Sequence, residues 1–91
     1  MKKVIIHPEQ LQTVSIDSIT NNSIVGIDWN SHKTWVIETK GQYCSLRIGD
    51  KTLAHKWEKP SIKDYCSEAI KIKAEVFVFD TEAELVKWLK S

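Results

Sequence analysis

Apolar and polar residues alternate along most of residues 13–57 of this 91-residue chain, which is the period of strands that bury one face. A two-residue turn at Asn21-Asn22 suits the first pair of strands, because asparagine tolerates left-handed backbone angles. That turn sets Ile16 opposite Ile27. It gathers five apolar side chains on one face: Val14, Ile16, Val25, Ile27 and Trp29. We therefore predict a first antiparallel hairpin, in a register that a slip of one residue would destroy.

A second hairpin is predicted around Lys40-Gly41. A two-residue turn there puts four residues together on a face that we expect to be core: Trp35, Ile37, Cys44 and Leu46. Tyr43 and Arg47 fall on the reverse face, where we expect them, together with Val36, to meet solvent. A bulged turn that ends at Gly41 is the alternative. It would move Tyr43 and Arg47 to the core face, so the tight turn is favoured.

The meander continues through a Gly49-Asp50 turn into a strand at Lys51–Trp57, which sets Tyr43 opposite Lys56. This last strand has the weakest alternation of the set. Residues 13–57 are thus predicted to form an antiparallel meander of four strands.

Helical spacing replaces alternation after Pro60. Ser61 is a predicted N-cap, with Asp64 three residues later. The apolar stripe of this first helix is Ile62, Tyr65, Cys66, Ala69 and Ile70. Thr81 and Glu84 form the same capping pattern before a second helix. The buried face of the second helix is predicted to be Leu85, Val86, Trp88 and Leu89.

Two short apolar runs remain, at Lys3–His7 and at Glu75–Phe79, and we expect them to pair as strands. The predicted element order is then β–ββββ–α–β–α. We expect a single α+β domain over residues 1–91. Its mainly antiparallel sheet would combine the four-stranded meander with one or two short strands, and both helices would pack on one face.

Composition places the chain among ordinary globular domains, with 42% hydrophobic and 27% charged residues. Apolar runs are too short for a secretory signal or a membrane span, and two cysteines are too few for a disulfide scaffold. We therefore expect a cytoplasmic protein with no membrane partner. The net charge is only +1, but residues 32–63 hold seven basic against three acidic residues, an excess of +4. Such asymmetry suits an anionic partner.

Reactive side chains are few. Cys44, His55 and Cys66 could in principle hold zinc or form a Cys–His nucleophile. Their spacing contains no Cys-x-x-Cys pair, however, and both cysteines are predicted to face inward, where thiols are inert. Asp17 and Asp28 on the polar face of the first hairpin are a candidate acid–base pair, but exposed strand carboxylates are the simpler interpretation. We expect no cofactor and no catalytic activity.

The basic middle of the chain predicts a binding surface on the outer face of the third to fifth strands. Its residues are Lys33, Lys40, Tyr43, Arg47, Lys56 and Trp57. Cations there would contact phosphates, and the ring of Tyr43 would stack on a base. We therefore predict a small non-enzymatic protein that binds nucleic acid or another polyanion.

The segment GIDWNSHKTWVIETKGQ resembles the sheet of AP2-type DNA-binding domains, which also occur as small arms on mobile-element integrases. The resemblance lies in Gly26, Ile27, Trp29, Lys33 and Trp35 and covers about a fifth of the chain. Four features depart from that family: the connecting turn is one residue shorter, basic residues are sparse on the first strand, an additional strand precedes the helix, and the segment at Phe79–Glu84 comes later in the chain.

A protein-interaction module is the alternative, for example an adaptor or a small inhibitor of the kind that mobile elements and phages encode. Strands at the edges of a compact sheet can pair with a strand of a partner. Trp57 and Val36, if exposed, would act as anchors.

Overall fold

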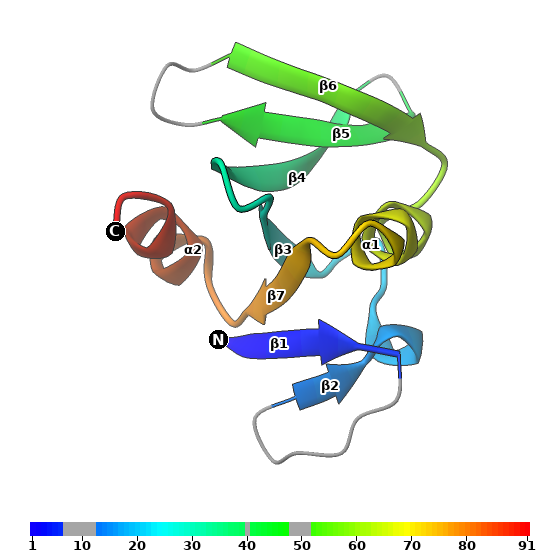
Figure 1. Ribbon diagram of the computed structural model, residues 1–91, viewed down its shortest axis with the longest axis horizontal. Helices are drawn as coiled ribbons and strands as arrows, with labels where there is room; N and C mark the ends of the chain where they lie inside the picture. The colour runs from blue at the N-terminus through cyan, green and yellow to red at the C-terminus, as the bar shows by residue number, and fades with distance from the viewer. Residues whose placement is uncertain (7–12, 40, 48–51) are drawn as a thin grey trace.

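The computed structural model of the protein describes residues 1–6, 13–39, 41–47 and 52–91, without the side chains of residues 39, 45–47 and 52–56. Within these ranges the chain forms one seven-stranded sheet and two α-helices (Figure 1). The strands are β1 (Lys2–Ile5), β2 (Thr13–Ser15), β3 (Ile24–Asp28), β4 (Lys33–Thr39), β5 (Gln42–Arg47), β6 (Thr52–Lys59) and β7 (Glu75–Phe79). The helices are α1 (Ile62–Lys71) and α2 (Glu82–Leu89), and a short 3₁₀ helix spans Ile16–Ser18.

The strand order across the sheet is β2-β1-β7-β3-β4-β5-β6, and neighbouring strands are antiparallel except β1 and β2. The α+β class and a mainly antiparallel sheet with two helices packed against it are therefore confirmed. The predicted pairing of the N-terminal strand with the strand between the helices is also confirmed, since Val4 of β1 lies opposite Val76 of β7.

The predicted first hairpin is wrong. β2 pairs with β1 in parallel, and β7 lies beside β3. β2 ends early because the Ser15 hydroxyl accepts a hydrogen bond from the Asp17 amide at 3.1 Å, which caps a turn of 3₁₀ helix containing Ile16. β7 offers β3 a second apolar strand, in which Val76 lies opposite Ile27 and both side chains are fully buried.

The hairpin of β4 and β5 has the predicted register, with Trp35 opposite Leu46 and Ile37 opposite Cys44. Gly41 lies in its turn with a φ of +79°, a backbone angle that glycine adopts without strain. The tight turn is thus confirmed over the bulged alternative. The predicted Gly49-Asp50 turn lies outside the described residues.

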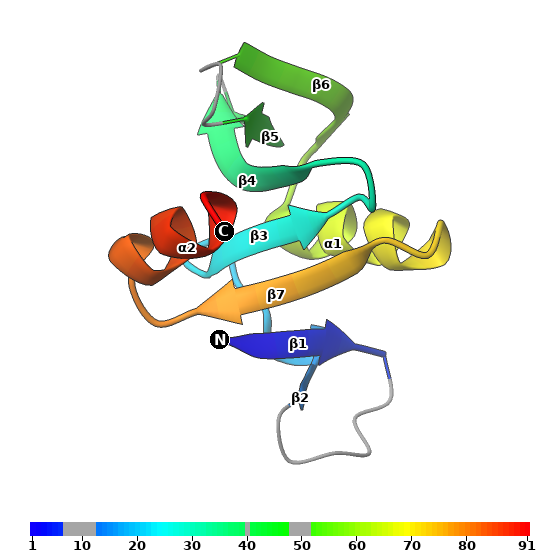
Figure 2. The same cartoon turned by 60° about the vertical axis from the view of Figure 1, so that its left-hand side comes forward.

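β6 contains a bulge that the sequence did not indicate. Tyr43 pairs with Lys59, and not with Lys56 as predicted. From this pair to the pair of Ser45 with Ala54, β5 advances by two residues whereas β6 spans five. The three extra residues bend the strand, as Figure 2 shows. The bend allows Trp57 to face α1, where its ring centroid lies 5.4 Å from that of Tyr65.

The two helices lie on opposite faces of the sheet (Figures 1 and 2), and not on one face as predicted. Gly26 faces α2, because a Cβ atom there would lie 2.5 Å from Trp88 Cζ3 and 2.7 Å from Leu85 Cδ1. Its neighbour Ile27 points the other way, into the main buried cluster. To that cluster α1 contributes Ile62, Tyr65, Cys66 and Ala69. Both faces of the central strands are apolar, so alternation could not assign the helices to one of them.

The orientation predicted for β4 and β5 is also wrong. Val36 (3% exposed) and Tyr43 (7% exposed) lie in the cluster against α1, whereas Trp35 is only half-buried. The sheet curls around α1, which contacts β7 as well as β5 and β6 although three strands separate β7 from β6 in the sheet. This curvature encloses the face that the sequence pattern marked as free.

Both predicted helix N-caps are confirmed. Ser61 Oγ accepts a hydrogen bond from the Asp64 amide at 3.1 Å, and Thr81 Oγ1 accepts one from the Glu84 amide at 3.2 Å. These contacts are local in sequence, so they set where each helix begins whichever face of the sheet the helix covers.

The contact between Gly26 and α2 predicts that Gly26→Ala destabilises the fold by about 1–3 kcal/mol, because the added methyl group overlaps Trp88 and Leu85. Urea denaturation measures this loss, and amide NMR spectra should show shifted resonances along α2. Gly41→Ala is the control: its Cβ meets nothing within 4 Å, so only its positive φ is strained and α2 resonances should stay in place. Unchanged α2 resonances in Gly26→Ala would contradict the packing.

Candidate functional site

β3 and β4 pair over only part of their length. The ladder joins Gly26 to Trp35, and continues only as far as Asp28 and Lys33. Beyond Trp35, residues 36–39 of β4 pair with β5 alone, while the start of β3 pairs with β7. Within the described part of the chain, the edge of β4 that faces β3 therefore carries no strand over these four residues.

A hollow of about 260 Å³ occupies the place where the two strands separate, and we call it the β3–β4 notch. One wall is the chain that leads into β3, and the other is β4 with its neighbour in β5. The start of each helix also reaches the notch. The lining residues are Asn21, Asn22, Ser23, Ile24, Trp35, Val36, Ile37, Glu38, Tyr43, Ile62 and Glu82.

Hydrogen bonds hold the first wall in place. Ser23 donates its amide to the Thr20 carbonyl at 3.0 Å, and its hydroxyl accepts from the Thr20 amide at 3.0 Å, which closes the turn at Asn21 and Asn22. Asn21 Oδ1 also accepts from the amide of Ile62 at 3.1 Å, so this turn caps the first residue of α1. The wall is thus joined to α1 before any partner binds.

The described charges of the notch are negative. Glu38 and Glu82 are both exposed, and among the described residues neither forms an ion pair. The Tyr43 hydroxyl donates to Glu38 Oε2 at 3.5 Å. Burial is the main cause that raises the pKa of Tyr43, and the negative charge of Glu38 raises it further. The hydroxyl therefore keeps its proton and remains a donor. Half-buried Trp35 also lines the hollow, but it lies on the opposite face of β4 from Glu38.

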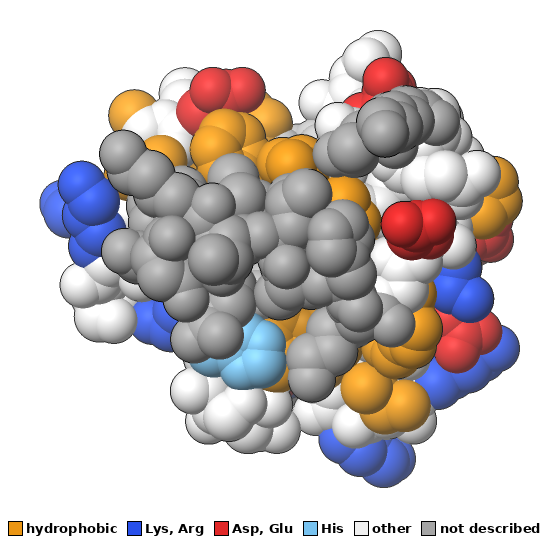
Figure 3. Space-filling model, turned by 90° about the horizontal axis from the view of Figure 1, so that it is seen from above, with side chains coloured by type: hydrophobic (Ala, Val, Ile, Leu, Met, Phe, Trp, Pro, Cys, Tyr) orange, Lys and Arg blue, Asp and Glu red, His pale blue; other side chains and the backbone are white. Residues whose placement is uncertain are grey.

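The predicted polyanion surface is not assembled by the described residues. Tyr43 is buried, so the expectation of an exposed stacking ring is wrong. Lys33 lies on the opposite face of β4 from the buried Thr34 and contacts α2. Lys40 and the side chains of Arg47 and Lys56 lie outside the described residues. Figure 3 shows lysines and acidic side chains interspersed around the face over β5 and β6, where most of the surface is not described.

Lys33 acts as a cap for α2. Its Nζ donates to the main-chain oxygens of Trp88 and Ser91, each at 3.2 Å, and to Ser91 Oγ at 3.0 Å. The same ammonium lies 5.1 Å from the centroid of the Trp88 ring. A cation at a helix C-terminus also interacts favourably with the helix dipole, so the contacts of Lys33 are intramolecular.

Trp57, the predicted anchor, is half-buried in an aromatic cluster. Its ring lies 5.4 Å from those of Trp29 and Tyr65 in edge-to-face geometry. Trp29 Nε1 donates to the buried Thr34 hydroxyl at 2.7 Å, which satisfies both groups. Val36, the other predicted anchor, is in the core, so its expected exposure is wrong.

The two cysteines do not share a site. Tyr43 and Cys44 are adjacent in β5 and so point to opposite faces, and Tyr43 is on the face of Cys66. Both thiols are buried, and burial raises the pKa of Cys66 to about 12. The described residues contain no group of three potential metal ligands, and the side chain of His55 lies outside them.

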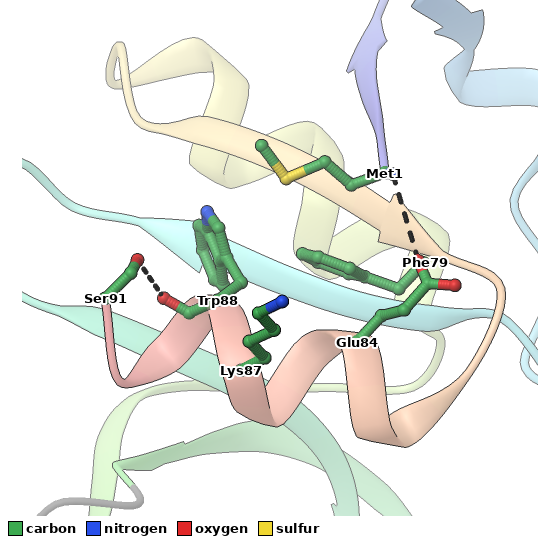
Figure 4. A pocket seen from close by; sticks show the side chains of 6 residues that line it. All are labelled: Met1, Phe79, Glu84, Lys87, Trp88 and Ser91. Carbon is green, nitrogen blue, oxygen red and sulfur yellow. Dashed lines mark hydrogen bonds and ion pairs between the residues drawn. The ribbon is translucent and has the colours of Figure 1, made fainter.

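A second hollow, of about 330 Å³, lies between β7, α2 and Met1 (Figure 4). Phe79 and Trp88, whose ring centroids are 5.3 Å apart, form its apolar side. Its rim carries charges of both signs. Lys87 lies about one turn of α2 from Glu84, and the Glu84 carboxylate is 4.0 Å from the Met1 amino group. This mixture indicates no ligand charge, whereas the described charges of the β3–β4 notch have one sign.

Sequence reasoning missed every charged member of the notch. Neither Glu38 nor Glu82 was among the predicted site residues: Glu38 lies on a strand, and Glu82 lies in the first turn of a helix, where acidic residues are common. The only relevant signal was the turn at Asn21-Asn22, which does form. Nothing in the sequence shows that β3 and β4 separate after three paired residues.

Comparison with protein-family models, with curated proteins and with solved structures finds no match to this chain. The partial resemblance to AP2-type domains thus gains no support. Neither described helix is long and apolar enough to cross a membrane.

The contacts of Lys33 predict that Lys33→Met lowers the free energy of unfolding by about 1 kcal/mol, because the α2 carbonyls lose a charged donor while the aliphatic stem stays over Trp88. Lys87→Met is the matched control, since Lys87 is exposed on the same helix and should change stability little. Urea denaturation of both variants provides the comparison, and equal losses would rule out the cap.

The raised pKa of Cys66 predicts a loss of stability in alkali. The unfolded thiol releases its proton near pH 9, whereas the folded thiol keeps it to about pH 12, so each added pH unit in this window favours the unfolded chain. The slope reaches about 1.4 kcal/mol per pH unit. Urea denaturation across the window measures it, and Cys66→Ala should flatten the slope even though the cavity lowers stability at every pH. An equally steep slope in Cys66→Ala would assign the effect to other groups.

Proposed function

We propose that this chain is a non-enzymatic protein-binding module that takes an extended segment of a partner protein into the β3–β4 notch. The observation that carries the proposal is the free edge of β4 over residues 36–39. An unpaired strand edge presents a row of amide and carbonyl groups, and an extended segment satisfies them by adding a strand. A hollow beside that edge leaves space for a side chain of the added segment.

The outer edges of the sheet are less suited to strand addition. β2 has three residues and runs directly into a 3₁₀ helix. β6 is bent by its bulge, and bulges and short strands protect sheet edges from pairing. The free segment of β4 has neither protection, and its register with β5 is regular from Trp35 to Thr39.

The polyanion prediction has less support from the described side chains. Tyr43 is buried and Lys33 is bound to α2, so three of the expected cations remain: Lys40, Arg47 and Lys56. The side chains of these three lie outside the described residues. Nucleic-acid binding therefore enters as an outcome of the experiment that tests the proposal.

Capture of partners from a cell lysate, with and without nuclease, tests the proposed function. Asn22→Trp should reduce capture at least tenfold, because Asn22 is exposed at the mouth of the notch and an indole there would fill it. Asn22→Ser is the matched control, since serine is also common in turns and leaves the space open. Equal capture by both variants would refute the notch as the binding surface. Capture that nuclease abolishes would instead favour the polyanion alternative.

A further inference from the structure

The two faces of the sheet at the β3–β4 notch indicate the kind of sequence that an added strand would have. We infer that the partner segment carries an apolar, β-branched residue such as valine, which packs on the α2 side of the sheet against Ile24, Trp35 and Ile37. This inference rests on the proposed function, because it describes the segment that would pair with β4.

Strand pairing puts these three apolar residues on the same face. Gly26 faces α2 and pairs with Trp35, so Trp35 shares that face, and Ile37 follows two residues later. Ile24 pairs with Phe79, whose ring packs against α2. All three residues also line the hollow, so the α2 side of the notch is apolar on both of its walls.

This side of the notch retains accessible apolar surface. Ile24, Trp35 and Ile37 are each half-buried. The helix α2 covers the same face over Gly26 and begins at Glu82, which itself lines the hollow. An aliphatic side chain placed against the three residues removes apolar surface of both partners from water, which is the dominant favourable term in most protein association.

The α1 side of the notch calls for a polar residue. Val36, Tyr43 and Ile62 line the hollow from that side and are already buried. Glu38 is exposed there, and it accepts a hydrogen bond from the Tyr43 hydroxyl. Residues of a strand alternate between the two faces, so the neighbours of the apolar residue would meet Glu38 and solvent. The partner segment should therefore alternate polar and apolar residues.

The free edge of β4 indicates that the occupant is extended. Within the described chain no strand pairs with the β3-facing side of residues 36–39. A helix satisfies its own backbone groups and would leave this edge unpaired, whereas an added strand pairs with it. The residue opposite Ile37 would share its face, and apolar cross-strand pairs stabilise a sheet. A β-branched side chain suits both a strand and a hollow of about 260 Å³.

Blocked pentapeptides of sequence Thr-Ser-Xaa-Ser-Thr, in which Xaa is valine or threonine, test this inference. Threonine has nearly the shape of valine but carries a hydroxyl in place of one methyl group, so the pair isolates the apolar contact. We expect the valine peptide to bind about tenfold more tightly in NMR titrations. Intermolecular NOEs should join its valine methyl groups to the indole of Trp35.

Two variants assign the preference to the α2 side of the sheet. Ile37→Thr should reduce the preference for valine to about threefold or less, because a hydroxyl enters the contact. Glu38→Gln is the matched control, since Glu38 is the next residue of β4 and lies on the other face, and it should leave the preference unchanged. Ile24→Thr, on the other wall, gives the same readout if Ile37→Thr folds poorly.

Backbone pairing is tested separately with two valine peptides that are N-methylated at alternate residues. One of the two should lose binding, because alternate amides of a strand point toward the same neighbour. Equal binding of the valine and threonine peptides, or an unchanged preference in both threonine variants of the protein, would overturn the apolar inference, while a loss on N-methylation would leave strand addition standing. Binding that neither N-methylation nor Asn22→Trp weakens would overturn the proposed function as well.

Discussion

Three side chains of α1 are completely removed from solvent: Tyr65, Cys66 and Ala69. The sheet achieves this burial by curling, so that α1 contacts β7 on one side and β5 and β6 on the other. Burial of apolar surface is the dominant favourable term in folding, and in a small domain one such contact shapes the rest. The bulge of β6, the inward position of Tyr43 and the separation of β4 from β3 all accompany this curvature.

Features with local signals were predictable from the sequence. Ser61 and Thr81 start helices because their hydroxyls bind amides three residues later, and the β4–β5 register follows from a short turn at Gly41. The faces of the strands were not predictable in the same way. Trp35 and Val36 are adjacent and both apolar, so either could face a helix, and the sheet in fact packs a helix on each face.

The role of a charged residue depends on contacts that the sequence does not specify. Lys33 belongs to the basic third of the chain, yet its ammonium binds the carbonyl of Trp88 at the end of α2, 55 residues further along the chain. A regional excess of positive charge therefore gives an upper limit on the cations free to bind a partner. Glu38 and Glu82 illustrate the converse, because acidic residues from different regions lie at one hollow only after the chain has folded.

Each carboxylate of the notch has an ordinary explanation when it is considered alone. An acidic residue in the first turn of a helix, such as Glu82, gains about 0.3–1 kcal/mol from the helix dipole. Glu38 lies at an exposed strand position where many polar residues are tolerated. Neither explanation requires an unpaired stretch of strand along the wall of the hollow. Stability therefore accounts for the two carboxylates separately, and the free edge of β4 over residues 36–39 is the feature of the notch that it does not explain.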